Sequence, residues 1–348
     1  GPGLRVARAS SAFQFRDQLP PRRFPIGEVA VLKAADPGRL RAFYQAWYRP
    51  ETAVLVSVGD FDPKQVEDRI RETFSDWKAS GPPGVAPPIG KVARRGPEAR
   101  VFVDPSLPAG IAVSWITEPE RAVDTLAQRQ VSLERALVLA ILNLRLSDVA
   151  RSASPPFLGA GASVAEPFQA QRSAGVYAVS VGGDWRRALE AVVAEQRRLV
   201  TYGIREDEVQ RVVTDVRASL TRARTGSGTR SPSALAGAVT GSITSRSVVT
   251  SPEQDLEGFE RAVKTIDAKA LSRVAGTLFR GSGPLVFLTS PKAIEGGERA
   301  VSEAARLALN AKVAPSEGQA AQAWPYLSFG EPSQVVERVE IPDLDAAR

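Results

Sequence analysis

Hydrophobic and polar positions predict a helix, a strand and a second helix between residues 36 and 77. The first helix opens at Asp36-Pro37, because aspartate accepts hydrogen bonds from first-turn amides and proline fits the first helical position. Its apolar residues follow at helical spacing on one face and are Leu40, Phe43, Tyr44 and Trp47. The uninterrupted apolar run at 53–58 then predicts a strand buried on both sides. The next helix opens at Asp62-Pro63.

The stretch at residues 79–97 is rich in proline and glycine without periodicity, which predicts a linker. Beyond it, both strands and helices are predicted. The predicted strands lie at 100–103, 110–116, 161–169 and 174–182, and the predicted helices at 124–151, 185–202, 206–224, from a polar break at 225–233 to about 246, and from 250 onward. Gly159-Ala160-Gly161 is interpreted as the stop of the long helix.

The pattern of the first helix and strand recurs later in the chain. When the sequence is shifted by 231 positions, Asp36 aligns with Asp267, Leu40 with Leu271, and the run at 53–58 with 284–289. Few residues are identical, but the agreement continues over about 30 positions, which is typical of a duplicated domain. Chance recurrence of a common helix–strand–helix pattern is the alternative. The second copy follows a full unit and the first follows only 35 residues, so we expect the front of the first unit to be missing.

Length and composition favour a globular chain with more than one core. The 348 residues are 43% hydrophobic and 24% charged, and two domains are expected at this length. No apolar run reaches the roughly 18 residues that span a membrane. Gly1-Pro2-Gly3 is expected to be the remnant of a removed tag. The net charge of +6 comes from cations scattered among nearly as many acids, so specific nucleic-acid binding is not favoured.

The absence of cysteine and histidine limits the possible chemistry. Without cysteine there is no disulfide framework and no thiolate nucleophile. Without histidine the chain lacks both the usual general base and the commonest zinc ligand. Ser75 and Lys78 fit an S-x-x-K motif of an unrelated hydrolase, but they stand at a predicted helix end and are better interpreted as structural. We therefore expect no catalytic residue and no metal ligand in this chain.

The sequence AFYQAWYRPETAVLVSVGDFDP at 42–63 resembles the helix–strand–helix signature of the M16 (insulinase-like, pitrilysin-like) zinc peptidases. Further stretches strengthen the resemblance by their order: FPIG before it, then ILNLRLSDVAR, LVTYGIREDEV, TSPEQDLEGFE, and a tail from 323 to 344. The resemblance implies an α+β fold with duplicated M16-type (LuxS/MPP-like) domains. Each domain would be a mostly antiparallel sheet with helices packed on one face.

The same resemblance implies a division of the chain. Residues 4–78 would be the C-terminal half of a first M16-type domain, and 79–97 the linker. Residues 98–313 would be a complete, non-catalytic second domain, and 314–348 a linker toward a third domain. The half-domain is expected to lack strand neighbours and to expose an apolar edge. It should then pack on the second domain, associate with another copy, or be poorly ordered.

The catalytic features of the family do not carry over. The family uses an inverted H-x-x-E-H helix for zinc, and this chain has no histidine, so the zinc is expected in the missing N-terminal part of the parent protein. The family also uses an arginine followed seven residues later by a tyrosine to hold substrate. Arg151 is at the matching place, but Leu158 replaces the tyrosine and the neighbouring Phe157 has no hydroxyl. Arg151 is thus a candidate substrate-binding residue, with a structural arginine at a helix end as the alternative.

The sequence therefore predicts a non-catalytic substrate-chamber portion of a larger M16-like zinc metalloendopeptidase that degrades or processes peptides. Its expected partners are peptide substrates, the remaining M16 domains of the parent chain, and a second copy bound through the half-domain, with no nucleic acid and no membrane span. A periplasmic or secreted bacterial location is expected, with the cytoplasm as the alternative. The competing hypothesis is a scaffold or assembly subunit from an inactive branch of the fold.

Overall fold

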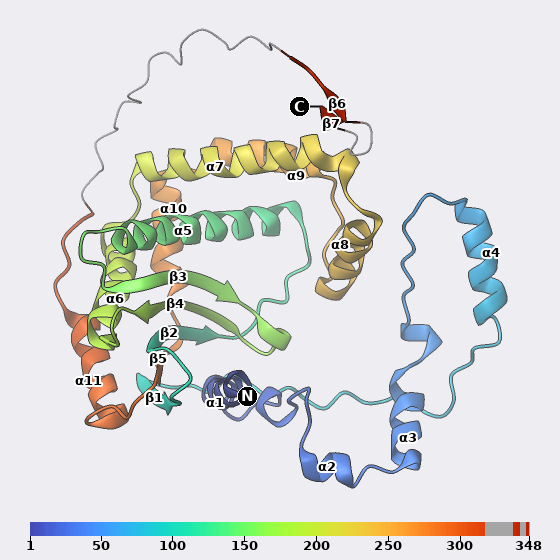
Figure 1. Cartoon of the computed structure of the whole chain (residues 1–348), viewed down its shortest axis with the longest axis horizontal. Helices are drawn as coiled ribbons and strands as arrows, with labels where there is room; N and C mark the ends of the chain where they lie inside the picture. Colours follow the sequence, from blue (N-terminus) through green and yellow to red (C-terminus); the bar gives the residue numbers. More distant parts are fainter. Residues whose placement is uncertain (317–336, 342–345, 348) are drawn as a thin grey trace. The chain divides into compact units, whose positions relative to one another are not determined.

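The computed structural model describes residues 1–316, 337–341, 346 and 347. Contacts divide the chain into two units, residues 1–315 and 316–348, which are described separately. The described part of the second unit is a short antiparallel pair, β6 (Glu340–Ile341) and β7 (Ala346–Ala347). Most of the predicted linker at 314–348 lies outside the described residues. Everything that follows concerns the first unit (Figure 1).

A five-stranded mixed sheet organises the first unit, with the strand order β1-β5-β2-β4-β3. The strands are β1 (Glu98–Val103), β2 (Gly110–Thr117), β3 (Phe157–Ala165), β4 (Arg172–Ser180) and β5 (Ser282–Ser290). Only the β1–β5 pair is parallel, and the other three pairs are antiparallel. The prediction of an α+β fold with a mostly antiparallel sheet is confirmed. Gly159-Ala160-Gly161 lies inside β3, so its interpretation as a helix stop was wrong.

Long helices cover one face of this sheet. They are α5 (Leu126–Ala150), α6 (Trp185–Tyr202), α10 (Ala268–Leu278) and α11 (Gly297–Asn310). Alternate strand residues such as Val113, Val176 and Leu288 point into a core that these helices share, as expected for strands with a side-chain period of two. An outer layer consists of α7 (Glu206–Thr225) and α9 (Pro252–Ala262), with α7 lying along α5 (Figure 1). Between them in sequence is α8 (Pro232–Ser245).

Among the described residues, α1 (Pro2–Gln14) is the helix that packs on the opposite sheet face. Its Phe13 packs on Phe287 of β5 with ring centroids 6.1 Å apart, in a small cluster with Ile116 and Leu285. Arg5 of α1 also donates to Asp104 at 2.9 Å. The predicted placement of helices on one face therefore holds for the main core, and α1 is an addition on the other face.

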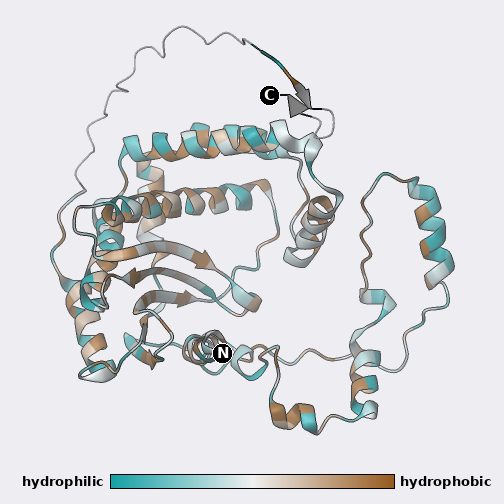
Figure 2. Ribbon diagram, viewed as in Figure 1, coloured by the Kyte–Doolittle hydropathy of each residue, from teal (hydrophilic) through white to brown (hydrophobic). Residues whose placement is uncertain are grey.

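The segment from residue 29 to 88 holds three helices and no strand. The helices are α2 (Val29–Lys33), α3 (Pro37–Trp47) and α4 (Pro63–Phe74). Residues 53–58 are extended, but no strand of the described residues pairs with them, and Val54 and Leu55 are exposed. The prediction of a buried strand here was wrong for this chain, because a strand is buried only where neighbouring strands exist. Figure 2 shows hydrophobic residues along α2 and on parts of α3.

Helices α3 and α10 have the same length and the same start. Each has eleven residues, and their bounds differ by the shift that relates the two sequence copies. The Asp36 side chain accepts from the amide of Arg39 at 2.9 Å, and Asp267 accepts from the amide of Ala270 at 2.7 Å. The local structure of the repeated helix thus recurs with its cap. Short 3-10 turns complete the fold at Pro20–Arg22, Pro50–Thr52, Pro167–Gln169, Gly226–Thr229 and Val263–Thr265.

Candidate functional site

No metal centre is formed by the described part of the chain. The sequence contains no histidine, and the described residues form no group of three or more potential metal ligands. No helix among them is long and apolar enough to cross a membrane. Zinc in the parent protein remains a prediction about residues that this sequence does not contain.

Arg151, the predicted substrate-binding residue, lies at the C-terminal end of α5. Its amide donates to the carbonyls of Ser147 and Asp148, each at 3.2 Å. Its exposed guanidinium donates to the Asp148 carboxylate at 2.5 Å. Leu158, seven residues on, is exposed, whereas Phe157 is fully buried in the core. This arrangement matches an arginine at the negative end of a helix dipole, and a role in substrate binding stays a prediction.

Sequence reasoning missed an apolar groove beside α1. One face of α1, with Val6, Ala9 and Phe13, packs on the sheet. Its next face presents residues at helical spacing that line the groove: Ala7, Ser10, Ser11 and Gln14. One face of α1 therefore packs in the core, and the adjacent face lines the groove. The sequence signal for this groove was the helical spacing of these small and polar residues, at positions i, i+3, i+4 and i+7.

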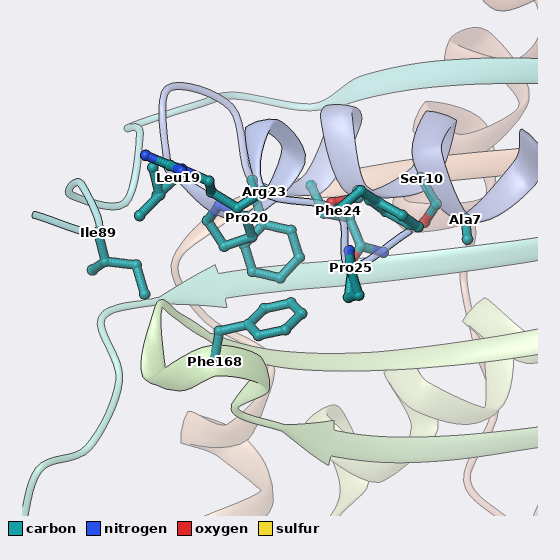
Figure 3. Close-up of a pocket in the computed structure, with 12 residues that line it drawn as sticks. Ala7, Ser10, Leu19, Pro20, Arg23, Phe24, Pro25, Ile89 and Phe168 are labelled. Atoms are coloured by element: carbon teal, nitrogen blue, oxygen red, sulfur yellow. The ribbon is translucent and has the colours of Figure 1, made fainter. Parts of the chain in front are cut away.

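A loop after α1 forms one wall of the groove, with Leu19, Pro20, Phe24 and Pro25 (Figure 3). The amide of Leu19 donates to the carbonyl of Ile89 at 2.9 Å, which anchors one end of the loop. At the other end, Arg8 donates to the carbonyl of Gly27 at 3.0 Å and pairs with Glu28 at 3.1 Å. These bonds fasten both ends of the wall to neighbouring segments.

Phe168, in the turn between β3 and β4, forms the facing side of the groove (Figure 3). Its φ of 58° lies in the left-handed region, which a phenylalanine adopts at a cost of about 1 kcal/mol or more. The ring meets Phe15 edge-on with centroids 6.0 Å apart. Buried Gln18 donates to the carbonyl of Ala170 at 2.9 Å and holds this turn against the loop. The resulting cavity of about 670 Å³ has an apolar lining with Arg23 as its cation.

A second hollow of about 390 Å³ lies between α1 and the strands β2, β4 and β5. Ala7 and Ser10 line both hollows. On this sheet face Tyr177 stands between Ala112 and Gly161, and a Cβ on Gly161 would lie 2.5 Å from the tyrosine oxygen. The glycine therefore makes room for the Tyr177 ring. Together the two hollows offer aromatic and small side chains, which suit the apolar side chains of an extended peptide.

A cluster of charged residues lies beside the β3–β4 hairpin, on the sheet face that α5 covers. Glu120 accepts from Arg135 at 2.5 Å and also from Arg172, which in turn donates to Glu166 at 2.6 Å. The Arg135 hydrogen bond, followed by that of Arg172, lowers the pKa of Glu120 to about 2. Each charge in the cluster has an opposite partner. The cluster therefore fixes the strands that carry the β3–β4 turn and offers no unpaired charge to a ligand.

Taken together, these features describe a helix-covered, mostly antiparallel domain without a histidine-based zinc centre. The family described as the peptidase M16 inactive domain matches residues 34–215, just over half of the chain, and the chain belongs to that family. The matched region includes the end of the predicted half-domain, the linker and the first part of the predicted second domain. The proposed domain boundaries at 78 and 98 are not tested by it.

Known proteins resemble parts of the chain. It is 33% identical over 136 residues to the chloroplastic stromal processing peptidase of Oryza sativa subsp. japonica, covering 38% of this chain and 10% of that protein. It is 34% identical over 74 residues to the probable zinc protease PqqL of Haemophilus influenzae, covering 21% and 8%. The chain therefore matches about a tenth of the length of these relatives.

A solved structure supports the fold along nearly the whole chain. The periplasmic protease PqqL from Escherichia coli superposes with a TM-score of 0.81 at 18% identity. The superposition covers 98% of this chain and 38% of the PqqL chain. At this identity the similarity concerns the fold, and the activity of PqqL is not transferred by it.

Proposed function

We propose that this chain is the non-catalytic, substrate-chamber portion of a larger M16-like zinc metalloendopeptidase that acts on peptides. The observation that carries the proposal is the second sheet face, where α1 borders two apolar hollows, one lined by Phe168 and the other by Tyr177. The helices of the core cover the other face, so a peptide reaches this unit from the α1 side. On this proposal residues 98–313 form one wall of the chamber, and the zinc lies in another domain.

The location proposed for the protein is the bacterial periplasm. Support comes from the similarity in fold to PqqL, which is described as a periplasmic protease. Fractionation of the producing organism with an antibody to the chain tests this proposal. Recovery with cytoplasmic markers would favour the alternative location.

The peptidase proposal is tested with the polypeptide translated from the natural reading frame that contains this chain. We expect an H-x-x-E-H motif before residue 1 and hydrolysis of an unstructured reporter peptide. Chelation should abolish hydrolysis, and added zinc should restore it. The 348-residue chain alone is the negative control, because it has no histidine. A frame without the motif, or an inert longer protein, would favour the scaffold hypothesis.

The hollows are tested by filling them. Ser10→Trp places an indole where both hollows meet α1, and we expect KM for the reporter peptide to rise about 10-fold with kcat unchanged. The matched control is Ser233→Trp, at an exposed position of α8 that lines neither hollow. Equal KM values for the two variants would show that peptides do not use these hollows.

A further inference from the structure

The loop wall of the groove beside α1, residues 19–25, offers few main-chain donors to a ligand. Three of these residues are prolines, which have no amide hydrogen. The amides of Arg22 and Arg23 already donate to carbonyls within the loop, at 3.0 and 3.1 Å, and the amide of Leu19 donates to Ile89. Addition of a peptide strand needs a row of main-chain donors and acceptors, so this wall is unsuited to it. Side chains must therefore supply most contacts to a ligand here.

The helical wall of the groove supplies polar side chains. Ser10, Ser11 and Gln14 are half-buried, and their side chains make no hydrogen bond to another residue in the described part of the chain. A hydroxyl or a carboxamide can both donate and accept. These three side chains can therefore bond to the amides and carbonyls of a peptide main chain that lies along α1.

The aromatic part of the groove is formed without a ligand. The Arg8 guanidinium lies 5.7 Å from the ring centroid of Phe24 and supports that ring from the side of the loop. On the facing side, the ring of Phe168 rests against Phe15, which is only 5% exposed. The cavity of about 670 Å³ lies within the range of about 300–1,000 Å³ that is usual for ligand pockets. It has room for a bulky apolar side chain and its neighbours.

Arg23 is the one charged residue among the twelve that line the groove (Figure 3). It is exposed, and its guanidinium makes no hydrogen bond or ion pair with the rest of the described residues. Asp17 and Arg22 are also exposed, but neither lines the groove. A planar guanidinium beside an apolar surface suits a carboxylate, which it can bind through two parallel hydrogen bonds.

We propose that the groove beside α1 binds a peptide segment in which a bulky apolar residue is followed by aspartate or glutamate. The apolar side chain would lie between Phe24 and Phe168, and the carboxylate would pair with Arg23. The inference rests on the proposed function, because it names the class of peptide that this part of the chamber selects.

Two other carboxylates fit the groove less well. The terminal carboxylate of a peptide is usually held by several main-chain amides, and the proline-rich wall has few to offer. A fatty acid would leave the polar side chains of Ser10, Ser11 and Gln14 without partners. An acidic side chain within a peptide uses Arg23, the aromatic rings and the polar wall together.

The test measures the binding of dye-labelled peptides to the 348-residue chain by fluorescence anisotropy, with an uncharged dye. The probe is acetyl-Gly-Ser-Phe-Glu-Ser-Gly-amide, and the comparison peptide has glutamine in place of glutamate. We expect Kd to be about 5-fold lower for the glutamate peptide, as for one partly exposed charge pair, and the difference should shrink at high salt. Arg23→Glu should abolish this preference and favour a peptide with lysine at the same position.

Matched variants separate the charge from the apolar contact. Arg22→Glu makes the same change of charge outside the groove and should keep the preference for glutamate. Phe168→Ala should raise Kd for both peptides by the same factor of about 10, whereas Phe61→Ala, at an exposed position outside the groove, should leave both unchanged. Circular dichroism checks that each variant is folded. Equal Kd values for the two peptides, or a preference that survives Arg23→Glu, would overturn the inference.

The outcomes also separate this inference from the proposed function. Selective binding by the chain, with no hydrolysis by the longer polypeptide of the same reading frame, supports the groove and overturns only the peptidase proposal. Hydrolysis with equal Kd values does the reverse. Binding of dodecanoate through Arg23, with neither peptide bound, overturns the inference in favour of an anionic lipid. A dimer in sedimentation that Phe168→Ala dissociates also overturns it, because the occupant is then a second copy.

Discussion

Arg145 and Glu208 form a deeply buried ion pair between α5 and α7. Two hydrogen bonds of 2.7 Å join the Arg145 guanidinium of α5 to the carboxylate of Glu208 in α7. Their side chains are only 8% and 6% exposed. Arg145 also donates to the carbonyl of Gly203, and Glu208 accepts from the amide of Arg205 at the start of α7. The pair therefore joins two helices and caps one of them.

Removing one partner of this pair should lower the free energy of unfolding substantially. Arg145→Ala leaves the Glu208 carboxylate buried without its cation, and we expect a loss of about 3–5 kcal/mol in the free energy of unfolding. Urea unfolding followed by circular dichroism measures it. The control is Arg145→Met combined with Glu208→Leu, which should recover most of the loss because neither charge remains. If the double variant is as unstable as Arg145→Ala, packing and not charge explains the effect.

Glu120 makes the stability of the unit depend on pH in the acid range. Its pKa is about 2 in the folded chain, below the ordinary value of 4.5, mainly because Arg135 donates to it. A lowered folded-state pKa stabilises the fold above the unfolded pKa, and this contribution is lost as pH falls from about 4.5 to about 2. Glu120→Gln should cost about 1–2 kcal/mol at pH 7 after allowance for solvent screening.

The same variant should match the unmodified chain near pH 2, where the Glu120 carboxylate gains a proton. Urea midpoints at pH 7, 5, 3 and 2 give the comparison. Glu253→Gln, at an exposed position at the start of α9, is the control for a general loss of charge. A constant difference between Glu120→Gln and the unmodified chain down to pH 2 would contradict the assignment.

At the level of elements, local signals predicted the helices from α3 to α9 well, missed α1 and predicted one strand badly. Asp36-Pro37 and Pro50 delimit α3 closely, because caps and prolines act through the residues beside them. The run at 53–58 has the right composition for a buried strand, but burial depends on neighbours that a local pattern does not report. The groove was missed for the same reason, since α1, Ile89 and Phe168 meet only in the folded chain.

Phe13 is the residue that attaches α1 to the sheet. It lies on Phe287, and the Arg95 guanidinium is 4.7 Å from its ring centroid. Phe13→Ala should weaken this attachment by about 3 kcal/mol and speed hydrogen exchange in α1, while α5 stays protected. Ser11→Ala, on the groove side of the same helix, is the control. Unchanged exchange in α1 would mean that Arg5 and the loop contacts hold the helix without Phe13.

At the level of the whole molecule, the fold class and the family were predictable and the domain boundaries remain a proposal. The mixed sheet with its helical layer and the M16 inactive domain match agree with the sequence resemblance. The missing histidine excluded a histidine-based zinc centre in this chain from composition alone. The sequence predicted that Arg151 lies at the end of the long helix, and the structure pairs it with Asp148. Its role in substrate binding stays a prediction.

The eleven-residue length of α3 has a thermodynamic consequence. Isolated helices shorter than about 12–15 residues are marginal in water, and most of their stability comes from packing of an apolar face. Since Leu40, Phe43 and Tyr44 of α3 are each more than half exposed, packing of this face on any surface should be coupled to ordering of the helix, with a rise in helical circular dichroism and a large negative heat-capacity change. Part of the association energy would be spent on ordering this segment, so the affinity should be lower than its buried area suggests.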